Sequence, residues 1–211
     1  MTGLIIKDFL VQRKTLRSYA LFLMFYIGMA AAGLFSISFV ASFVQIIVMI
    51  LPMSSFAYDE LAKWDRYALT LPVGRRTVVT ARYLFVIFMI ALASLFAVAS
   101  CLLLSLIQQG DMLENLGTAS ASLALGLLVA DLNLPMNYAM GPERSRPYLY
   151  ATIFLPVLAL FGAAKLGWLD GLDQLSPSVL TSLFLFIPLL PLLGLPVSYL
   201  ISCQIMERKE F

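Results

Sequence analysis

The segment from Tyr58 to Tyr83 carries the densest set of charged side chains in the sequence. The whole chain has 14 basic and 12 acidic residues, and this segment holds eight of those 26: Asp59, Glu60, Lys63, Asp65, Arg66, Arg75, Arg76 and Arg82. Asp59 and Glu60 precede Lys63 by four and three residues, the spacing at which side chains pair along a helix. Charges gathered in one loop of an apolar chain favour ion pairing with a soluble partner.

The same segment contains a predicted helix break. Pro72 keeps Leu71 out of the α region, and Val73 and Gly74 complete a turn. We therefore expect a short helix before the break and a second helix that starts at Arg75. An ordinary basic loop is the alternative, but it explains the arginines and leaves the acidic residues and the loop length unexplained.

One carboxylate, Asp131, lies well inside an apolar run and is followed by Asn133 and Pro135. An ionisable side chain in such a place is paired, faces a cavity or has a function. Two interpretations stay open. Asp131 is satisfied by Arg144, Arg146 or the polar backbone beside Pro135, which we favour, or it contacts a substrate.

Residue types that most enzymes need are missing. The chain has no histidine, which removes the commonest general base and the commonest zinc ligand. Cys101 and Cys203 both lie in apolar runs, where a thiol acts as a small hydrophobic group, so neither a metal site nor a disulfide is implied. The sequence also lacks a GxxxxGK[ST] loop for nucleotide phosphates. We expect no catalytic residue, no metal and no cofactor bound by this chain.

The composition is that of an all-α integral membrane protein. Hydrophobic residues make up 61% and charged residues 12% of the chain, with a mean hydropathy of +0.93. Typical soluble domains have about 45–50% apolar and about 25% charged residues. The net charge of +2 is too small to indicate a nucleic-acid partner.

The gaps between charges predict six transmembrane helices in a single domain of residues 1–211. Residues 18–57 are long enough for a helix pair with a turn near Gly33, because about 20 residues cross the hydrocarbon core. Residues 58–83 form the connecting loop with the coupling helix, and residues 84–211 hold four more spans and the tail. These spans are expected at about 84–107, 116–138, 148–166 and within 174–206, the last one after a short external helix.

An even number of spans puts both termini on one side of the membrane. If that side is the cytoplasm, all of the 14 basic residues except Lys165 are cytoplasmic, as the positive-inside rule requires. Residues 1–17 have an apolar sector containing Ile5, Ile6 and Phe9, which predicts an interfacial amphipathic helix. That helix either anchors the topology on anionic lipid headgroups or connects the membrane domain to a cytoplasmic partner.

Three prolines, Pro188, Pro191 and Pro196, lie in the last apolar run. Proline kinks a membrane helix where neighbouring groups satisfy the freed backbone. These residues are candidates for a gate, although bending of a lipid-facing helix would use the same residues.

Four segments occur in a recognisable order: Lys7-Asp8, the loop FAYDELAKWDRYALTLPVGRRTVVTARYL, the junction LPMNYAMGPERSRPY and the end SYLISCQIMERKEF. Together they resemble the ABC type 2 permeases, the membrane subunits of ATP-binding cassette transporters. The resemblance spans nearly the whole chain. It implies that a separate cytoplasmic ATPase, carrying ATP and Mg, docks on the loop, and that a second permease copy or paralogue completes the transport path.

By this resemblance, the docking candidates in the loop are Asp59, Glu60, Lys63, Asp65, Arg66, Arg75 and Arg76. Glu143, Arg144 and Arg146 either make a second ATPase contact or only fix the turn. The implied function is a permease subunit in a bacterial cytoplasmic membrane that exports an amphipathic peptide, a lipid or a drug. A membrane assembly or immunity factor that docks a partner without transport is the alternative.

Overall fold

The computed structural model describes residues 2–35, 37–68, 70, 74–108, 112–168, 179 and 186–209. The side chains of Asp65 and Arg66 and the break at 71–73 lie outside this description. Its helices are α1 (Thr2–Ala31), α2 (Ile37–Leu61), α3 (Trp64–Ala68), α4 (Arg75–Gln108), α5 (Met112–Met140), α6 (Pro142–Lys165) and α8 (Leu189–Arg208).

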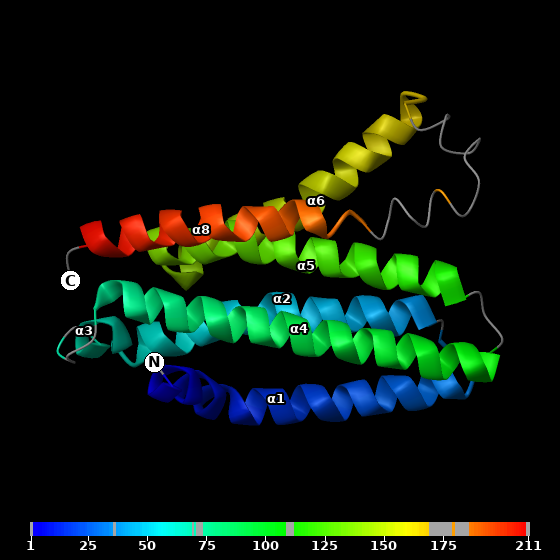
Figure 1. Cartoon of the computed structure of the whole chain (residues 1–211), viewed down its shortest axis with the longest axis horizontal. Helices are drawn as coiled ribbons and strands as arrows, with labels where there is room; N and C mark the ends of the chain where they lie inside the picture. Colours follow the sequence, from blue (N-terminus) through cyan, green and yellow to red (C-terminus); the bar gives the residue numbers. More distant parts are fainter. Residues whose placement is uncertain are drawn as a thin grey trace.

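The bundle is formed by α1, α2, α4, α5 and α8, which run alongside one another (Figure 1), and α6 leaves it at an angle. The start of α1, the short α3, the start of α4 and the end of α8 lie at one end, which we call the loop end. Within the described residues, four stretches are long and apolar enough to cross a membrane: Arg75–Ser100, Ala119–Met140, Pro142–Lys165 and Leu189–Arg208.

The predicted boundary between an interfacial helix over 1–17 and a first span is absent, because α1 is one helix of 30 residues. The stretch around Arg17 and Ser18 holds no proline or glycine that would end a helix, so the change from charged to apolar side chains leaves the backbone continuous. The predicted turn does occur at Gly33, whose φ of 78° favours glycine.

The acidic pair of the loop lies on the last turn of α2 and not on a separate helix, because α2 continues to Leu61. The chain leaves the helix at Lys63, which has a φ of 50°, and α3 adds only five residues. The second predicted helix does start at Arg75 and continues through the apolar run as α4.

The motif GPERSRP interrupts the helical structure at one residue only, Gly141, and its other residues are helical. Gly141 has a φ of 82°, and Pro142 then begins α6 at a position where proline costs no intrahelical hydrogen bond. The fifth predicted span therefore starts six residues earlier than the expected Tyr148.

Two of the three proline candidates mark the start of α8. Pro188 is the N-cap and Pro191 lies in the first turn, so only Pro196 is interior to the helix. Most of the expected external helix before it lies outside the described residues.

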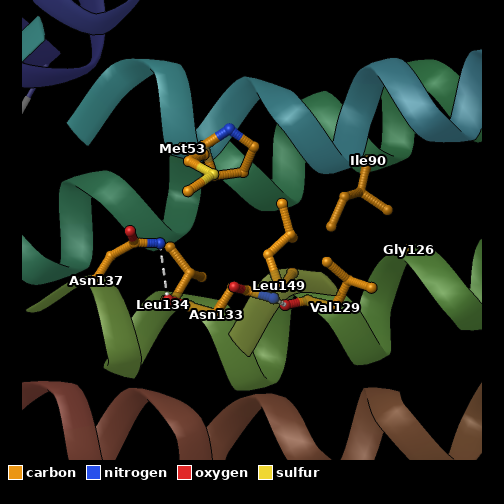
Figure 2. Close-up of a pocket in the computed structure, with 10 residues that line it drawn as sticks. Met53, Ile90, Gly126, Val129, Asn133, Leu134, Asn137 and Leu149 are labelled. Carbon is orange, nitrogen blue, oxygen red and sulfur yellow. Dashed lines mark hydrogen bonds between the residues drawn. The ribbon is translucent and has the colours of Figure 1, made fainter. Parts of the chain in front are cut away.

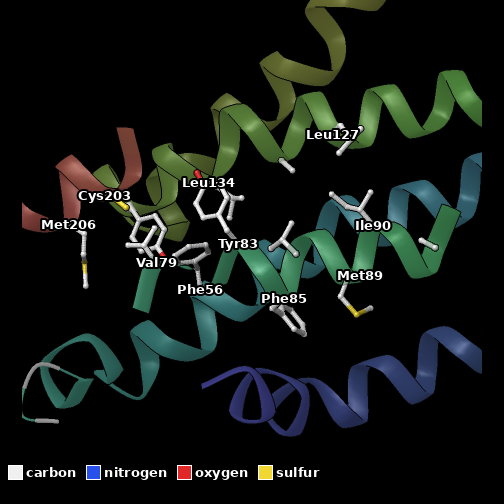
Figure 3. Packing of buried hydrophobic residues seen from close by; sticks show 14 of the residues in the cluster. Phe56, Val79, Tyr83, Phe85, Met89, Ile90, Leu127, Leu134, Cys203 and Met206 are labelled. Atoms are coloured by element: carbon white, nitrogen blue, oxygen red, sulfur yellow. The ribbon is translucent and has the colours of Figure 1, made fainter. Parts of the chain in front are cut away.

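The main apolar core lies between α2, α4, α5 and α8 (Figure 3). Phe85, Leu134 and Met206 are among its most buried side chains. α1 packs onto this core through Phe9, whose ring centroid is 5.0 Å from that of Phe85.

Candidate functional site

Four charged side chains meet near the loop end, and we call them the four-charge cluster: Lys7 and Asp8 of α1, Asp59 of α2 and Arg82 of α4. Lys7 Nζ lies 2.7 Å from Asp59 Oδ1 and 3.1 Å from Asp8 Oδ1. Arg82 donates to Asp8 Oδ1 at 3.0 Å and, through its other terminal nitrogen, to Asp59 Oδ2. Two positive and two negative charges thus close a ring that is neutral overall.

Neighbouring groups complete the hydrogen bonding of this cluster. Arg82 also donates to the Ser55 hydroxyl and lies 4.8 Å from the centroid of the Phe56 ring. Lys7 lies over the Trp64 ring of α3 at 4.3 Å. Burial raises the pKa of the Asp8 carboxyl above its ordinary value, and the charges of Arg82 and Lys7 counter this only in part.

The cluster joins three helices and the loop by charge-assisted hydrogen bonds, which are stronger than neutral ones. Asp59 pairs with Lys7 and Arg82, and the predicted pairing with Lys63 is not formed among the described side chains. The Asp59 side chain is only 8% exposed, so it binds within this chain and is not presented to a partner. Arg82 was not among the predicted site residues, although an arginine inside an apolar helix needs a carboxylate partner.

The remaining docking candidates with described side chains are exposed at the loop end, and Arg75 alone is half-buried. We call the exposed set the docking surface: Glu60, Lys63, Arg76, Glu143 and Arg144. Its two parts adjoin, since a Cβ added at Gly141 would lie 3.6 Å from Glu60 Oε1. The loop after α2 and the junction between α5 and α6 are therefore neighbours.

The start of α4 is fastened to the end of α8. Arg75 Nη1 donates to the backbone carbonyls of Met206, Glu207 and Lys209, which are otherwise open at a helix C-terminus. Arg76 forms an exposed ion pair with Glu207. Arg75 thus has a structural role in this conformation.

Asp131 faces α8 and does not pair with either predicted arginine. Its side chain is buried, and its Oδ1 has no hydrogen-bond partner among the described residues. Oδ2 approaches α8 so closely that a Cβ added at Gly194 would lie 2.6 Å from it. Arg144 and Arg146 are exposed on α6, so the predicted pairing is absent from the described structure.

The backbone beside Pro135 explains a contact between α5 and α8. Proline has no N–H, so Pro135 leaves the carbonyl of Asp131, four residues earlier, without its helical donor. The Ser198 hydroxyl donates to that carbonyl at 2.6 Å. Ser198 also bonds the Tyr83 hydroxyl, which in turn bonds Ser202, so one chain of hydrogen bonds joins α4, α5 and α8.

Asn133 and Asn137 line a small pocket between α2, α4, α5 and α6 (Figure 2). Its volume of about 10 Å³ is close to that of a single water site. Asn137 donates to the Asn133 carbonyl and accepts from Ser145, whereas Asn133 Oδ1 has no partner among the described groups. The pocket suits one water molecule rather than a substrate.

The described residues contain no group of three or more His, Cys, Asp or Glu side chains that could hold a metal ion. Within the described residues, the charged groups of the four-charge cluster and of Asp131 form ion pairs or pack between helices, and the docking candidates lie exposed at the loop end.

Comparison with known proteins identifies a family for this chain. The family model described as "ABC-2 family transporter protein" matches residues 3–207. No curated protein and no solved structure matches the chain. The matched range includes both the four-charge cluster and Asp131.

Proposed function

The chain belongs to the ABC-2 transporter family, whose members are multi-pass membrane components that associate with an ABC ATPase, and we propose that it is the permease subunit of an exporter. In this proposal the chain crosses the membrane six times with both termini in the cytoplasm. A separate ATPase binds ATP and Mg, docks at the loop end and drives the helices between inward-open and outward-open arrangements.

The observation that carries this proposal is the position of the docking surface directly beside the four-charge cluster. Glu60 lies on the same helical turn as Asp59, which Lys7 and Arg82 hold to α1 and α4. A force on the exposed side of this turn reaches three helices through buried ion pairs. Because these ion pairs are buried, rotation of one side chain cannot take up the displacement. A lever between the ATPase and the permease requires such a rigid connection.

A second permease copy accounts for the position of α6. Only 6% of its membrane-length stretch is buried within the chain, compared with 33–50% for the other three. Its apolar side chains include Phe154, Leu158 and Phe161, which are about 60% exposed. We propose that α6 packs against the second subunit. Substituted cysteines at Leu158 should form a disulfide between two chains in the membrane, and a monomeric band alone would contradict this contact.

The docking assignment is tested with three charge reversals, two in the docking surface (at Lys63 and Arg144) and one control outside it. Lys63→Glu lies in the docking surface, whereas Lys165→Glu changes an exposed lysine at the other end of α6. The permease is co-purified with the ATPase that carries a Walker A loop. We expect Lys63→Glu and Arg144→Glu to lower the amount of bound ATPase and Lys165→Glu to leave it unchanged. Full ATPase binding by both docking-surface variants would show that the ATPase docks elsewhere.

Export is tested in inside-out vesicles that hold both subunits. The family resemblance suggests labelled amphipathic peptides, lipids and drugs as substrates, and ATP should drive accumulation of one of these classes. A complex that binds ATPase but accumulates none of them would support the alternative of an assembly or immunity factor.

A further inference from the structure

A groove of about 520 Å³ lies between α1 and α4. It is on the side of the bundle away from α6, the helix that carries Glu143 and Arg144 of the docking surface (Figure 1). Its lining includes Leu16, Ala20 and Met24 of α1 and Met89, Ala93 and Phe96 of α4. The volume lies in the range of ligand pockets, about 300–1,000 Å³. Nearly all of its lining is apolar.

The groove opens sideways, toward the surroundings of the bundle. Met24 and Leu92 on its rim are 70% and 49% exposed. In a membrane this rim meets the hydrocarbon tails of lipids, so an acyl chain can enter without crossing water.

Two arginines of α1 lie on the same side of the helix as residues at the rim of the groove. Arg13 precedes Ala20 by seven residues, and Arg17 precedes Met24 by seven. Seven residues turn a helix through about 700°, which is within about 20° of two full turns, and rise about 10.5 Å. Because α1 is continuous over this range, each arginine lies on the same side of the helix as the groove residue above it.

Both arginines are exposed. Lys7, by contrast, uses its charge in the four-charge cluster and is 19% exposed. The positive charge that α1 offers beside the groove therefore comes from Arg13 and Arg17. Arginine binds phosphate oxygens in a forked geometry that lysine cannot reproduce.

We propose that this groove is a binding site for one anionic glycerophospholipid, with its phosphate headgroup on Arg13 and Arg17 and one acyl chain between α1 and α4. The apolar lining accepts the tail, and the arginines two helical turns nearer the loop end select the charge of the headgroup. The site is independent of ATPase docking, since none of its residues belongs to the docking surface.

The test uses the full-length protein in lipid nanodiscs of phosphatidylcholine that contain a trace of photoactivatable phosphatidylglycerol or phosphatidylcholine, each with a diazirine on one acyl chain. After illumination, mass spectrometry locates the labelled peptides. We expect phosphatidylglycerol to label α1 and α4 about thirtyfold more than phosphatidylcholine does, because each of two basic side chains near an anionic lipid contributes a factor of about five.

Matched variants separate the headgroup from the tail. Arg13→Gln and Arg17→Gln should each lower the preference for phosphatidylglycerol, whereas Lys14→Gln should not. Lys14 lies about 160° around the helix from Leu16 in the groove. Each variant removes one positive charge.

Filling the groove tests the tail site. Ala20→Leu and Ala93→Leu should reduce labelling by both lipids, and Ala91→Leu, on the exposed opposite side of α4, should leave it unchanged. Ala20 is exposed, so its variant keeps the test valid if Ala93→Leu disturbs folding.

Equal labelling by the two lipids, unaffected by the arginine variants, would overturn the proposal. Labelled peptides that map away from α1 and α4 would overturn it too. A disulfide between two chains carrying Ala20→Cys would show that a second copy, not a lipid, occupies the groove.

Discussion

Two buried ionisable sites in the same bundle are built in opposite ways. In the four-charge cluster, every charge faces an opposite one, and Arg82 also donates a hydrogen bond to the Ser55 hydroxyl. Asp131 is buried just as deeply, yet its Oδ1 has no partner among the described residues and its Oδ2 lies against Gly194. A compensated cluster stabilises one arrangement of its helices, whereas an uncompensated carboxylate disfavours the arrangement that buries it.

This difference suggests which helix contacts move in a transport cycle. The junction of α1, α2 and α4 should stay together, because separating it would leave charges unpaired. The contact of α5 with α8 should open more readily, because opening would hydrate Asp131. The following variants test this comparison, from the largest expected effect to the smallest.

Replacing Arg82 by methionine should have the largest effect. It leaves Asp8 and Asp59 buried with only Lys7 to compensate them, and breaking a buried ion pair in this way costs about 3–5 kcal/mol. Unfolding in detergent should show a large drop in stability. Arg82→Lys, which keeps the charge but not the fork, should lose less. A methionine variant as stable as the parent would mean that the cluster does not hold the helices together.

The same change from aspartate to asparagine should act differently at the two sites. Asp59→Asn weakens the bonds to Lys7 and Arg82, and a bond to a charged group contributes about 1.5–3 kcal/mol. Asp131→Asn removes a charge that has no counterion among the side chains that the structure describes, so stability should stay the same or rise. Paired unfolding measurements compare the two variants. A loss at residue 131 equal to that at residue 59 would refute the distinction between the sites.

Gly194→Ala should destabilise the contact of α5 with α8 by about 1–3 kcal/mol through overpacking. The new methyl group would lie 2.6 Å from Asp131 Oδ2. Adding Asp131→Ala should recover most of the loss. Gly162→Ala on α6 is the control, since nothing lies within 4 Å of a Cβ there. Equal losses for Gly194→Ala with and without Asp131 would show that the two residues do not interact.

Arg76→Gln should have the smallest effect. Its ion pair with Glu207 is exposed, and water and salt screen such pairs. The change in thermal midpoint should be too small to measure, while ATPase binding falls because Arg76 belongs to the docking surface. A clear loss of stability would show that an exposed charge on α4 can also have a structural role.

Much of the fold could be predicted from local signals. Gly33 ended the first helix, Gly141 and Pro142 separated α5 from α6, and Arg75 began α4, because backbone preferences at these residues act without tertiary contacts. The predicted helix boundaries were wrong where a change from charged to apolar side chains was interpreted as the end of a helix. The polar face of residues 1–17 suggested a separate helix, although no residue there breaks one.

The sites were harder to predict because their members come from distant parts of the chain. Lys7, Asp59 and Arg82 are each ordinary charged residues in their own segments, and only the packing of α1, α2 and α4 brings them together. Asp59 therefore looked like a docking residue. For the same reason, the favoured partners of Asp131 were the nearest arginines in sequence rather than α8.

The sequence by itself determined that this protein lies in the membrane, that its charges gather in one loop, and that Pro135 leaves the Asp131 carbonyl without a helical donor. These features follow from side-chain chemistry and from hydrogen bonds within one helix. Only the tertiary structure decided that Ser198 supplies the missing donor and that Asp59, but not Asp131, has a counterion within the described part of the chain. Such pairings depend on how each helix is rotated against its neighbours, and that rotation is fixed by the packing of the whole bundle.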